Sequence, residues 1–101
     1  LRKKIYILSP VVRGKKGEYA SLMRRLSKDG FSRIRADGKI YDLDDDVRLN
    51  KYHIHNIEVL VDRIVVSGLA AKRVSDSIET ALHYSGGVII VNIVDENKDI
   101  L

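Results

Sequence analysis

The chain has 101 residues and a mass of 11.4 kDa, which leaves room for about one domain with one hydrophobic core. Hydrophobic residues make up 45% and charged residues 32%, a balance typical of a folded domain and not of a disordered tail. No cysteine is present, which excludes disulfides and thiolate-based metal or redox sites in this sequence. We therefore expect a single domain over residues 1–101 and no multidomain enzyme.

No stretch of the chain is apolar over the roughly 20 residues that a membrane-spanning helix needs, and no signal peptide opens it. The longest apolar runs, such as residues 88–91, are far shorter. The sequence begins at Leu1 without a methionine and closes on Ile100 and Leu101. We expect a cytoplasmic domain excised from a longer protein.

Charge is distributed unevenly along the chain, although the net charge is only +4. Residues 1–40 carry 12 basic and 3 acidic side chains, a net charge of +9, whereas residues 41–101 carry 6 and 11, a net charge of −5. Such asymmetry indicates an electrostatic face that steers a charged partner. Nucleic acid and an acidic protein both remain open as that partner.

The first predicted elements are a strand and an amphipathic helix. Residues 5–8 are apolar, and the strand is expected to end at Pro10 because proline cannot donate to a sheet ladder. Glu18 is placed at the start of the helix, and Gly30 is expected to cap its carboxyl end. Four apolar residues share one face of this helix: Tyr19, Leu22, Met23 and Leu26.

Three strands and a second helix follow. Residues 31–36 and 39–41 flank Asp37-Gly38 and predict a tight hairpin. A polar surface connection over residues 42–50 leads to a long strand over residues 56–66, with both faces substantially covered. The second helix is marked by Val74, Ile78, Ala81, Leu82 and Ser85 and ends at Gly86-Gly87, before a buried strand over residues 88–94.

These elements predict an α+β (mixed α/β) fold. Its order is β-α-β-β-β-α-β, with two amphipathic helices and a mixed, partly antiparallel sheet of about five strands.

Residue patterns for catalysis or metal binding are weak. We favour a surface pair for His53 and His55 because no further ligands complete a coordination shell, and a solvated loop for the acidic residues 44–46. The Arg-Gly-Lys-Lys-Gly run at residues 13–17 lacks the spacing of a phosphate-binding loop. The serines, including Ser9, Ser21 and Ser77, lie in no nucleophile motif. The sequence therefore predicts a non-catalytic chain without a cofactor or metal of its own.

Charged residues in unusual places indicate a binding surface. Asp62 and Arg63 interrupt an apolar strand, so either they reach water or a neighbouring partner at a bulge, or they are exposed binding charges. Lys72 and Arg73 oppose the dipole at a helix start, which an acidic partner would explain.

The hairpin strand adds a stripe of basic residues. Arg33 and Arg35 share the side opposite Ile34 and Ala36, so we expect both arginines to project away from the core. Arginine is favoured at charged interfaces, although such a stripe is more often merely solvated.

Four segments, in register over nearly the whole chain, resemble the UvrA component of the bacterial excinuclease ABC system. They are residues 10–19 (PVVRGKKGEY), 33–38 (RIRADG), 55–63 (HNIEVLVDR) and 73–82 (RVSDSIETAL). The resemblance implies the UvrB-binding domain inserted in the first ATP-binding module of UvrA, the damage sensor of bacterial nucleotide excision repair. It also implies that ATP, zinc and the principal DNA surface belong to other parts of a parent ATPase that is a homodimer.

The resemblance further implies a charged docking surface for UvrB. The matching positions are Arg35, Arg63 and Arg73, with Asp62 and Glu79 as reciprocal charges. The alternative is a small nucleic-acid-binding domain that sets the basic residues of segment 1–40 against DNA phosphates. Its weakness is that aromatic residues make up only 6% of the chain and that Tyr6, Tyr19 and Phe31 are expected in the core, which leaves few rings to stack on bases.

Overall fold

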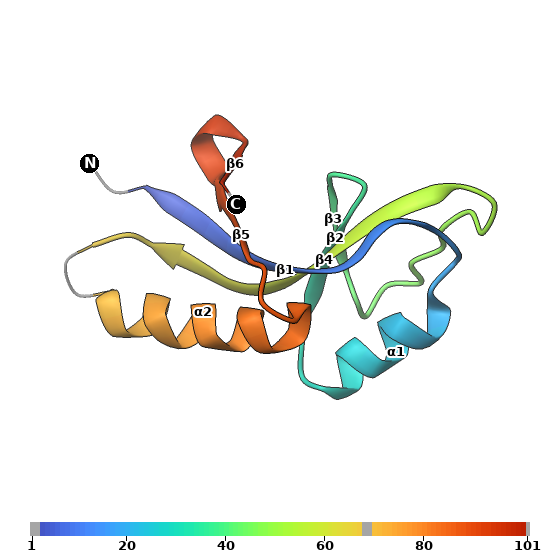
Figure 1. The fold of residues 1–101 in the computed structure, drawn as a ribbon, viewed down its shortest axis with the longest axis horizontal. Coiled ribbons are helices and arrows are strands. Elements are labelled where there is room, and N and C mark those ends of the chain that lie inside the picture. Colours follow the sequence, from blue (N-terminus) through green and yellow to red (C-terminus); the bar gives the residue numbers. More distant parts are fainter. Residues whose placement is uncertain (1–2, 68–69, 101) are drawn as a thin grey trace. The chain divides into compact units, whose positions relative to one another are not determined.

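A computed structural model describes residues 3–67 and 70–100 (Figure 1). Leu1 and Leu101, whose positions at the chain ends suggested an excised domain, lie outside the described residues. The elements are β1 (Lys4–Lys16), α1 (Ala20–Lys28), β2 (Arg33–Ala36), β3 (Lys39–Asp42), β4 (Ile54–Val65), α2 (Ala71–Ser85), β5 (Ile90–Ile93), the 3-10 turn η1 (Val94–Glu96) and β6 (Lys98–Ile100).

The α+β class is confirmed. The sheet has six strands, one more than expected, in the order β3-β2-β4-β1-β5-β6. The additional strand is β6, which pairs antiparallel with β5 from Val91↔Ile100 to Ile93↔Lys98. Its three residues are too few to show a period-two pattern, so no sequence signal predicted it. Neither described helix is long and apolar enough to cross a membrane.

Backbone contacts divide the chain into two compact units. One takes residues 1–10 and 60–101, and the other takes residues 11–59. By sequence the first unit has 7 basic and 6 acidic residues, and the second has 11 and 8, so their net charges are +1 and +3. The strong asymmetry along the sequence is therefore largely levelled out, because nine of the twelve basic residues of segment 1–40 share the second unit with the acidic run over residues 42–46. Both β1 and β4 contribute residues to each unit.

The first unit is organised around the amino-terminal half of β1. β5 pairs antiparallel with it from Ile5↔Ile93 to Leu8↔Ile90. Ser9 is fully buried, and its hydroxyl donates to the carbonyl of Ala81 on α2 at 2.7 Å. The core of the first unit has three buried residues, Ile7, Ile64 and Ala81. Partly buried hydrophobic residues pack against them: Ile5, Val61, Ala70, Val74, Ile78 and Ile89. Of the predicted apolar stripe of α2, Val74, Ile78 and Ala81 pack in this core, whereas Leu82 is 36% exposed.

β1 does not end at Pro10, as the sequence predicted. The strand continues to Lys16 and buries Pro10. Its pairing with β5 stops at Leu8, so the missing N–H group of Pro10 removes no hydrogen bond to that neighbour. A proline interrupts a strand only where a neighbouring strand would accept a hydrogen bond from its N–H group. The hydrogen bonding between β1 and β5 ends at Leu8, before Pro10.

The second unit contains the predicted hairpin. Asp37 and Gly38 both have positive φ, 52° and 86°, and join β2 to β3 with Ala36 opposite Lys39. β2 also pairs antiparallel with β4, from Ile34↔Val59 to Ala36↔Ile57. All four of these paired residues on β2 and β4 are buried.

The predicted helices are present, with shifted ends. α1 begins at Ala20, after Tyr19 in a left-handed conformation, so Glu18 lies outside it. Its carboxyl end has the predicted glycine: the Gly30 amide donates to Ser27 and the Phe31 amide to Leu26, a pair of bonds that closes the last turn. α2 ends at Ser85, before Gly86, as expected.

The last predicted strand is shorter and more exposed than its sequence suggested. β5 spans Ile90–Ile93, and its only buried residue is Asn92, whose amide donates to Asp99 Oδ1 at 2.7 Å. The other three residues of β5 remain partly exposed. The expectation of a buried strand is therefore wrong for three of the four residues of β5, which lies next to the exposed edge strand β6.

Candidate partner-binding surface

Asp62 on β4 is the centre of a charged cluster in the first unit. Its carboxylate accepts hydrogen bonds from Arg73 Nη2 at 2.7 Å and Arg73 Nε at 3.0 Å, and from the Ser77 hydroxyl at 2.7 Å. The Asp62 side chain is 20% exposed and that of Arg73 is 62% exposed. Of the two interpretations left open by the sequence, a charge paired with a neighbour fits Asp62, because α2 supplies that neighbour.

These contacts keep Asp62 ionised. The hydrogen bond from Arg73 lowers the pKa of Asp62 most, desolvation opposes it, and further hydrogen bonds from Ser77 and the Arg63 amide help to hold the pKa below its usual value. The two cations at the start of α2 are thus partnered within the chain, Arg73 by Asp62 and Lys72 by Asp76 at 3.1 Å. The carboxylates of Asp62 and Asp76 therefore offset the unfavourable interaction of these cations with the helix dipole, and no acidic partner protein is needed to explain them.

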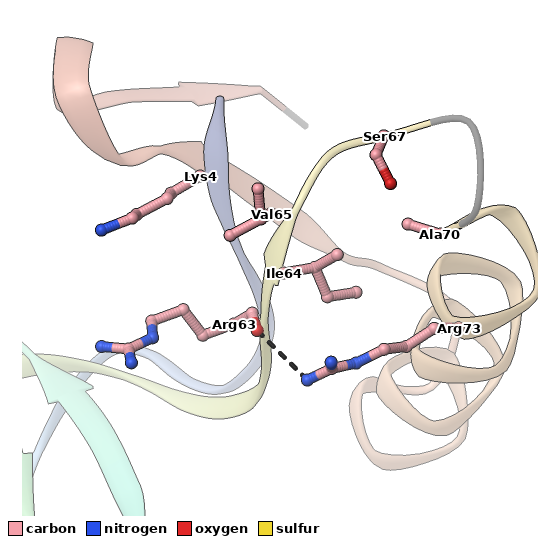
Figure 2. A pocket seen from close by; sticks show the side chains of 7 residues that line it. All are labelled: Lys4, Arg63, Ile64, Val65, Ser67, Ala70 and Arg73. Carbon is pink, nitrogen blue, oxygen red and sulfur yellow. Dashed lines mark hydrogen bonds between the residues drawn. The ribbon is translucent and has the colours of Figure 1, made fainter. Parts of the chain in front are cut away.

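A shallow groove of about 390 Å³ lies beside this cluster (Figure 2). Its charged residues are Lys4, Arg63 and Arg73. Arg63 is exposed, and among residues 3–67 and 70–100 no carboxylate pairs with its guanidinium. The remaining lining residues are Ile64, Val65, Ser67 and Ala70. The groove therefore combines the positive charge of Arg63, which no carboxylate among the described residues neutralises, with the apolar lining residues Ile64, Val65 and Ala70.

Arg35 lies in the second unit and is far less exposed. Its Nε donates to Glu58 Oε1 at 2.6 Å, and the two side chains are only 11% and 8% exposed. The pair is a direct consequence of register, because Arg35 lies opposite Glu58 in the β2–β4 ladder. Of the predicted arginine stripe, only Arg33 is exposed.

The structure thus groups Asp62, Arg63 and Arg73 in one unit, with Glu79 exposed further along α2. Sequence reasoning missed Ser77 as a partner of Asp62, although its i, i+4 spacing from Arg73 places both on one helix face. It also missed Lys4 and Glu58. No sequence signal identifies these two, because their positions depend on which strands pair and in what register.

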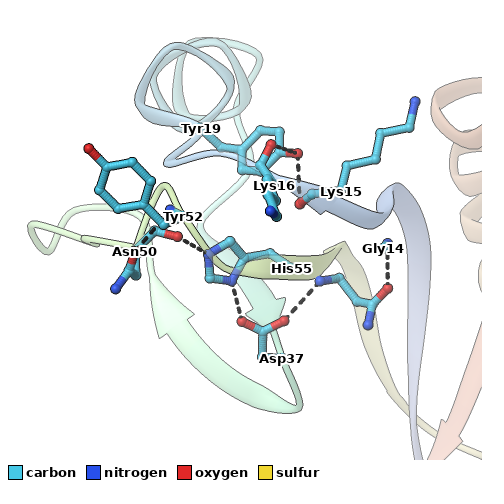
Figure 3. Close-up of polar contacts among 9 residues, drawn as sticks. Gly14, Lys15, Lys16, Tyr19, Asp37, Asn50, Tyr52 and His55 are labelled. Atoms are coloured by element: carbon cyan, nitrogen blue, oxygen red, sulfur yellow. Dashed lines mark hydrogen bonds and ion pairs between the residues drawn. The ribbon is translucent and has the colours of Figure 1, made fainter.

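His55 is not a surface residue, and the predicted surface pair with His53 is wrong (Figure 3). His55 is 5% exposed, with Nδ1 2.6 Å from Asp37 Oδ2 and Nε2 2.6 Å from the Asn50 carbonyl. Both ring nitrogens face acceptors, so the ring can donate to both only when it is protonated. The hydrogen bond to Asp37, followed by that to Asn50, raises the pKa of His55 despite desolvation.

The same contacts act on Asp37 in the opposite direction. Desolvation raises the pKa of Asp37, but the hydrogen bond from the Asn56 amide and the interactions with His55 outweigh it, and the pKa is lower than usual. His55 thus holds the β2–β3 turn and the segment before β4 together. In the described part of the chain no three or more histidine, aspartate or glutamate side chains gather as a metal would require.

The family model and the similar proteins that match this chain all name the same protein, UvrA. The model of the UvrA interaction domain matches residues 1–95. UvrABC system protein A of Clostridium acetobutylicum is 46% identical over 94 residues, which are 92% of this chain and 10% of that protein. The protein of the same name from Oceanobacillus iheyensis is 46% identical over 97 residues, 96% of this chain and 10% of its own length.

The Mycobacterium tuberculosis protein of that name is 45% identical over 89 residues, 88% of this chain and 9% of its own length. The chain thus spans about a tenth of the length of the curated relatives it matches. The resemblance found in four sequence segments is confirmed. The chain belongs to the UvrA interaction domain family.

Proposed function

We propose that this chain is the docking domain through which a UvrA protein of bacterial nucleotide excision repair binds UvrB in the cytoplasm, so that UvrB is loaded at DNA lesions. The observation that carries this proposal is the match of residues 1–95 to a family described as an interaction domain. The chain's own task is binding, and catalysis belongs to the parent protein.

The charged groove of the first unit supports this function. Arg63 is exposed without a carboxylate partner in the described chain, and Arg73 is 62% exposed while it holds Asp62. A carboxylate of UvrB at this groove would therefore meet positive charge that is already oriented. Asp62 and Glu79 would serve as reciprocal charges for basic side chains of UvrB, which would fix the orientation of the complex.

Arg35, which belongs to the second unit, is a further proposed contact residue for UvrB, and its contribution differs from that of the groove residues. Since its side chain is 11% exposed and bonded to Glu58, it would offer UvrB only the edge of its guanidinium. Its larger effect would be to keep Glu58 neutralised inside the second unit. We further propose that ATP, zinc, the principal DNA surface and the dimer contacts of the parent ATPase lie outside this chain.

Calorimetric titration of the chain with purified UvrB tests the docking function. We expect saturable one-to-one binding, weakened at least about tenfold by Arg63→Ala and by Arg73→Ala, because central arginines at interfaces contribute most of the binding energy. Lys98→Ala, an exposed lysine on β6 with no acidic partner in the described chain, is the matched control and should bind as the unaltered chain does. Absence of binding would overturn the docking function, and unchanged affinity in both arginine variants would remove the groove from the interface.

A further inference from the structure

One end of the second unit brings two basic segments together. The Gly14 amide on β1 donates to Asn56 Oδ1 on β4 at 2.8 Å. A Cβ atom at Gly14 would lie 3.9 Å from Ile54 Cγ2, so the strands run side by side here (Figure 3). β1 continues from this point to Lys16, and β4 is preceded by residues 51–53. The two segments therefore leave the sheet at the same end.

These segments carry a group of exposed cations that we call the basic tip. Its members are Arg13, Lys15, Lys16 and Lys51, with His53 beside them, and all five are exposed. None of the five is paired with a carboxylate in the described part of the chain. By contrast, Arg48 just before this region is paired with Asp46 at 2.8 Å. The basic tip thus has positive charge that the fold leaves unneutralised.

An exposed aromatic ring, that of Tyr52, follows Lys51 in one of the two segments of the basic tip. Tyr52 is 72% exposed, a larger fraction than that of any other large hydrophobic residue in the described chain. The Lys51 ammonium lies 5.2 Å from the centre of its ring. Ile54, two residues after Tyr52, is 61% exposed. The Tyr52 ring therefore lies outside the hydrophobic core and is available for stacking on a base. The scarcity of such rings is the argument that the sequence offers against nucleic-acid binding.

The basic tip is held in place from both sides. Asn50 Oδ1 accepts from the Tyr52 amide at 2.9 Å, and the Asn50 carbonyl accepts from His55 at 2.6 Å. On the other segment, the Tyr19 hydroxyl lies 3.0 Å from the carbonyls of both Lys15 and Lys16.

Gly17 makes this second anchor possible. A Cβ atom there would come within 3.0 Å of the Tyr19 ring, and its φ of 150° is one that side chains rarely adopt. The backbone that carries Lys15, Lys16 and Tyr52 is therefore held in place, which lowers the entropy cost of binding.

We propose that the basic tip binds a single strand of nucleic acid, with phosphates on Arg13, Lys15 and Lys16 and one unstacked base against the ring of Tyr52. Cationic grooves with an exposed aromatic platform are how proteins hold single strands without reading their sequence. An acidic protein segment would use the cations but would gain little from the ring. This function uses other side chains than the groove proposed for UvrB docking, whose Arg63 and Arg73 belong to the first unit.

Fluorescence anisotropy with labelled oligothymidylate tests the proposal on the 101-residue chain. We expect Tyr52→Ala to weaken binding about tenfold and Tyr52→Phe to retain it, because stacking needs the ring and not the hydroxyl. Lys15→Gln/Lys16→Gln should weaken binding and lower the slope of log K against log salt by about 1.4, the loss of two phosphate contacts. The backbone amide of Tyr52 donates to the side-chain oxygen of Asn50, a hydrogen bond that all these variants keep.

The matched control removes the same charge from α1 through Arg25→Gln/Lys28→Gln, two exposed residues of the same unit. This control should bind oligothymidylate nearly as the unaltered chain does. Equal losses in the two double variants would overturn the proposal in favour of unspecific attraction to net charge. Binding of an oligoglutamate peptide as tight as that of oligothymidylate, with Tyr52→Ala unaffected, would overturn it in favour of an acidic protein partner.

Discussion

Two arginine–carboxylate pairs, each with its carboxylate on β4, differ in burial between the two units. Arg35 and Glu58 are 11% and 8% exposed, whereas Arg73 and Asp62 are 62% and 20% exposed. A buried pair costs much when one partner is removed, because the other charge is left desolvated, whereas an exposed pair contributes little. Two residues predicted alike as contact arginines are therefore suited to different tasks: Arg35 to holding its unit together, and Arg73 to meeting a partner.

The largest change in stability is expected when the buried pair of Arg35 and Glu58 is broken. Arg35→Ala should lower the free energy of unfolding by about 3–5 kcal/mol, because the Glu58 carboxylate stays buried without its cation. Urea denaturation followed by circular dichroism measures this change. Arg63→Ala truncates an exposed arginine on β4 that has no carboxylate partner among the described residues, and it should change the free energy of unfolding by less than about 0.5 kcal/mol.

Replacing both partners sharpens the same comparison. Arg35→Met/Glu58→Leu should be close to the unaltered chain in stability, because no unpaired charge remains. A double variant as unstable as Arg35→Ala would show that packing around the pair, and not the orphaned charge, is responsible.

A smaller loss is expected at the exposed pair. Asp62→Ala should lower the free energy of unfolding by about 1–2 kcal/mol, since Arg73 and Ser77 lose an acceptor but Arg73 can turn to water. Because the pKa of folded Asp62 lies below 3.8, this stabilisation is complete above pH 3.8 and disappears as the pH falls through the folded value. Denaturation of both proteins between about pH 2 and 7 checks it, and a difference that persists at the acid end would contradict the role of the charge.

The buried histidine of the second unit should show the opposite pH dependence. Because the pKa of folded His55 is raised above 6.5, its contribution to stability is complete below pH 6.5 and is lost as the pH rises through the folded value. His55→Gln should thus be less stable than the unaltered chain at about pH 6, with the difference shrinking toward about pH 9. Denaturation curves across this range measure it, and a constant difference would indicate a neutral His55.

A smaller effect on stability than that of Asp62→Ala is expected for Arg73→Ala. Its side chain is 62% exposed, so the unfolding midpoint should stay close to that of the unaltered chain even though UvrB binding falls. Denaturation and calorimetry on the same preparation separate the two properties. A large drop in the midpoint would mean that Arg73 supports the fold in the way Arg35 does.

Much of the local structure could be predicted because it depends on short-range patterns. Asp37-Gly38 specifies its turn through two residues that tolerate positive φ, and the stripe from Leu22 to Leu26 specifies one helix face. The family resemblance was equally readable, since four segments in register do not depend on coordinates. The candidate charges at positions 62, 63 and 73 were found because they break an expected pattern.

The tertiary structure alone decided what those residues do. Whether Arg35 faces water or Glu58 depends on the register of β2 against β4, and whether His55 is exposed depends on where Asp37 and Asn50 lie. Pro10 was misjudged for the same reason, because its cost depends on whether a neighbour needs its N–H group. Pairing between distant segments sets burial, and burial sets the energy of every charge, so the sequence reveals which groups are charged and the fold determines which of them remain available.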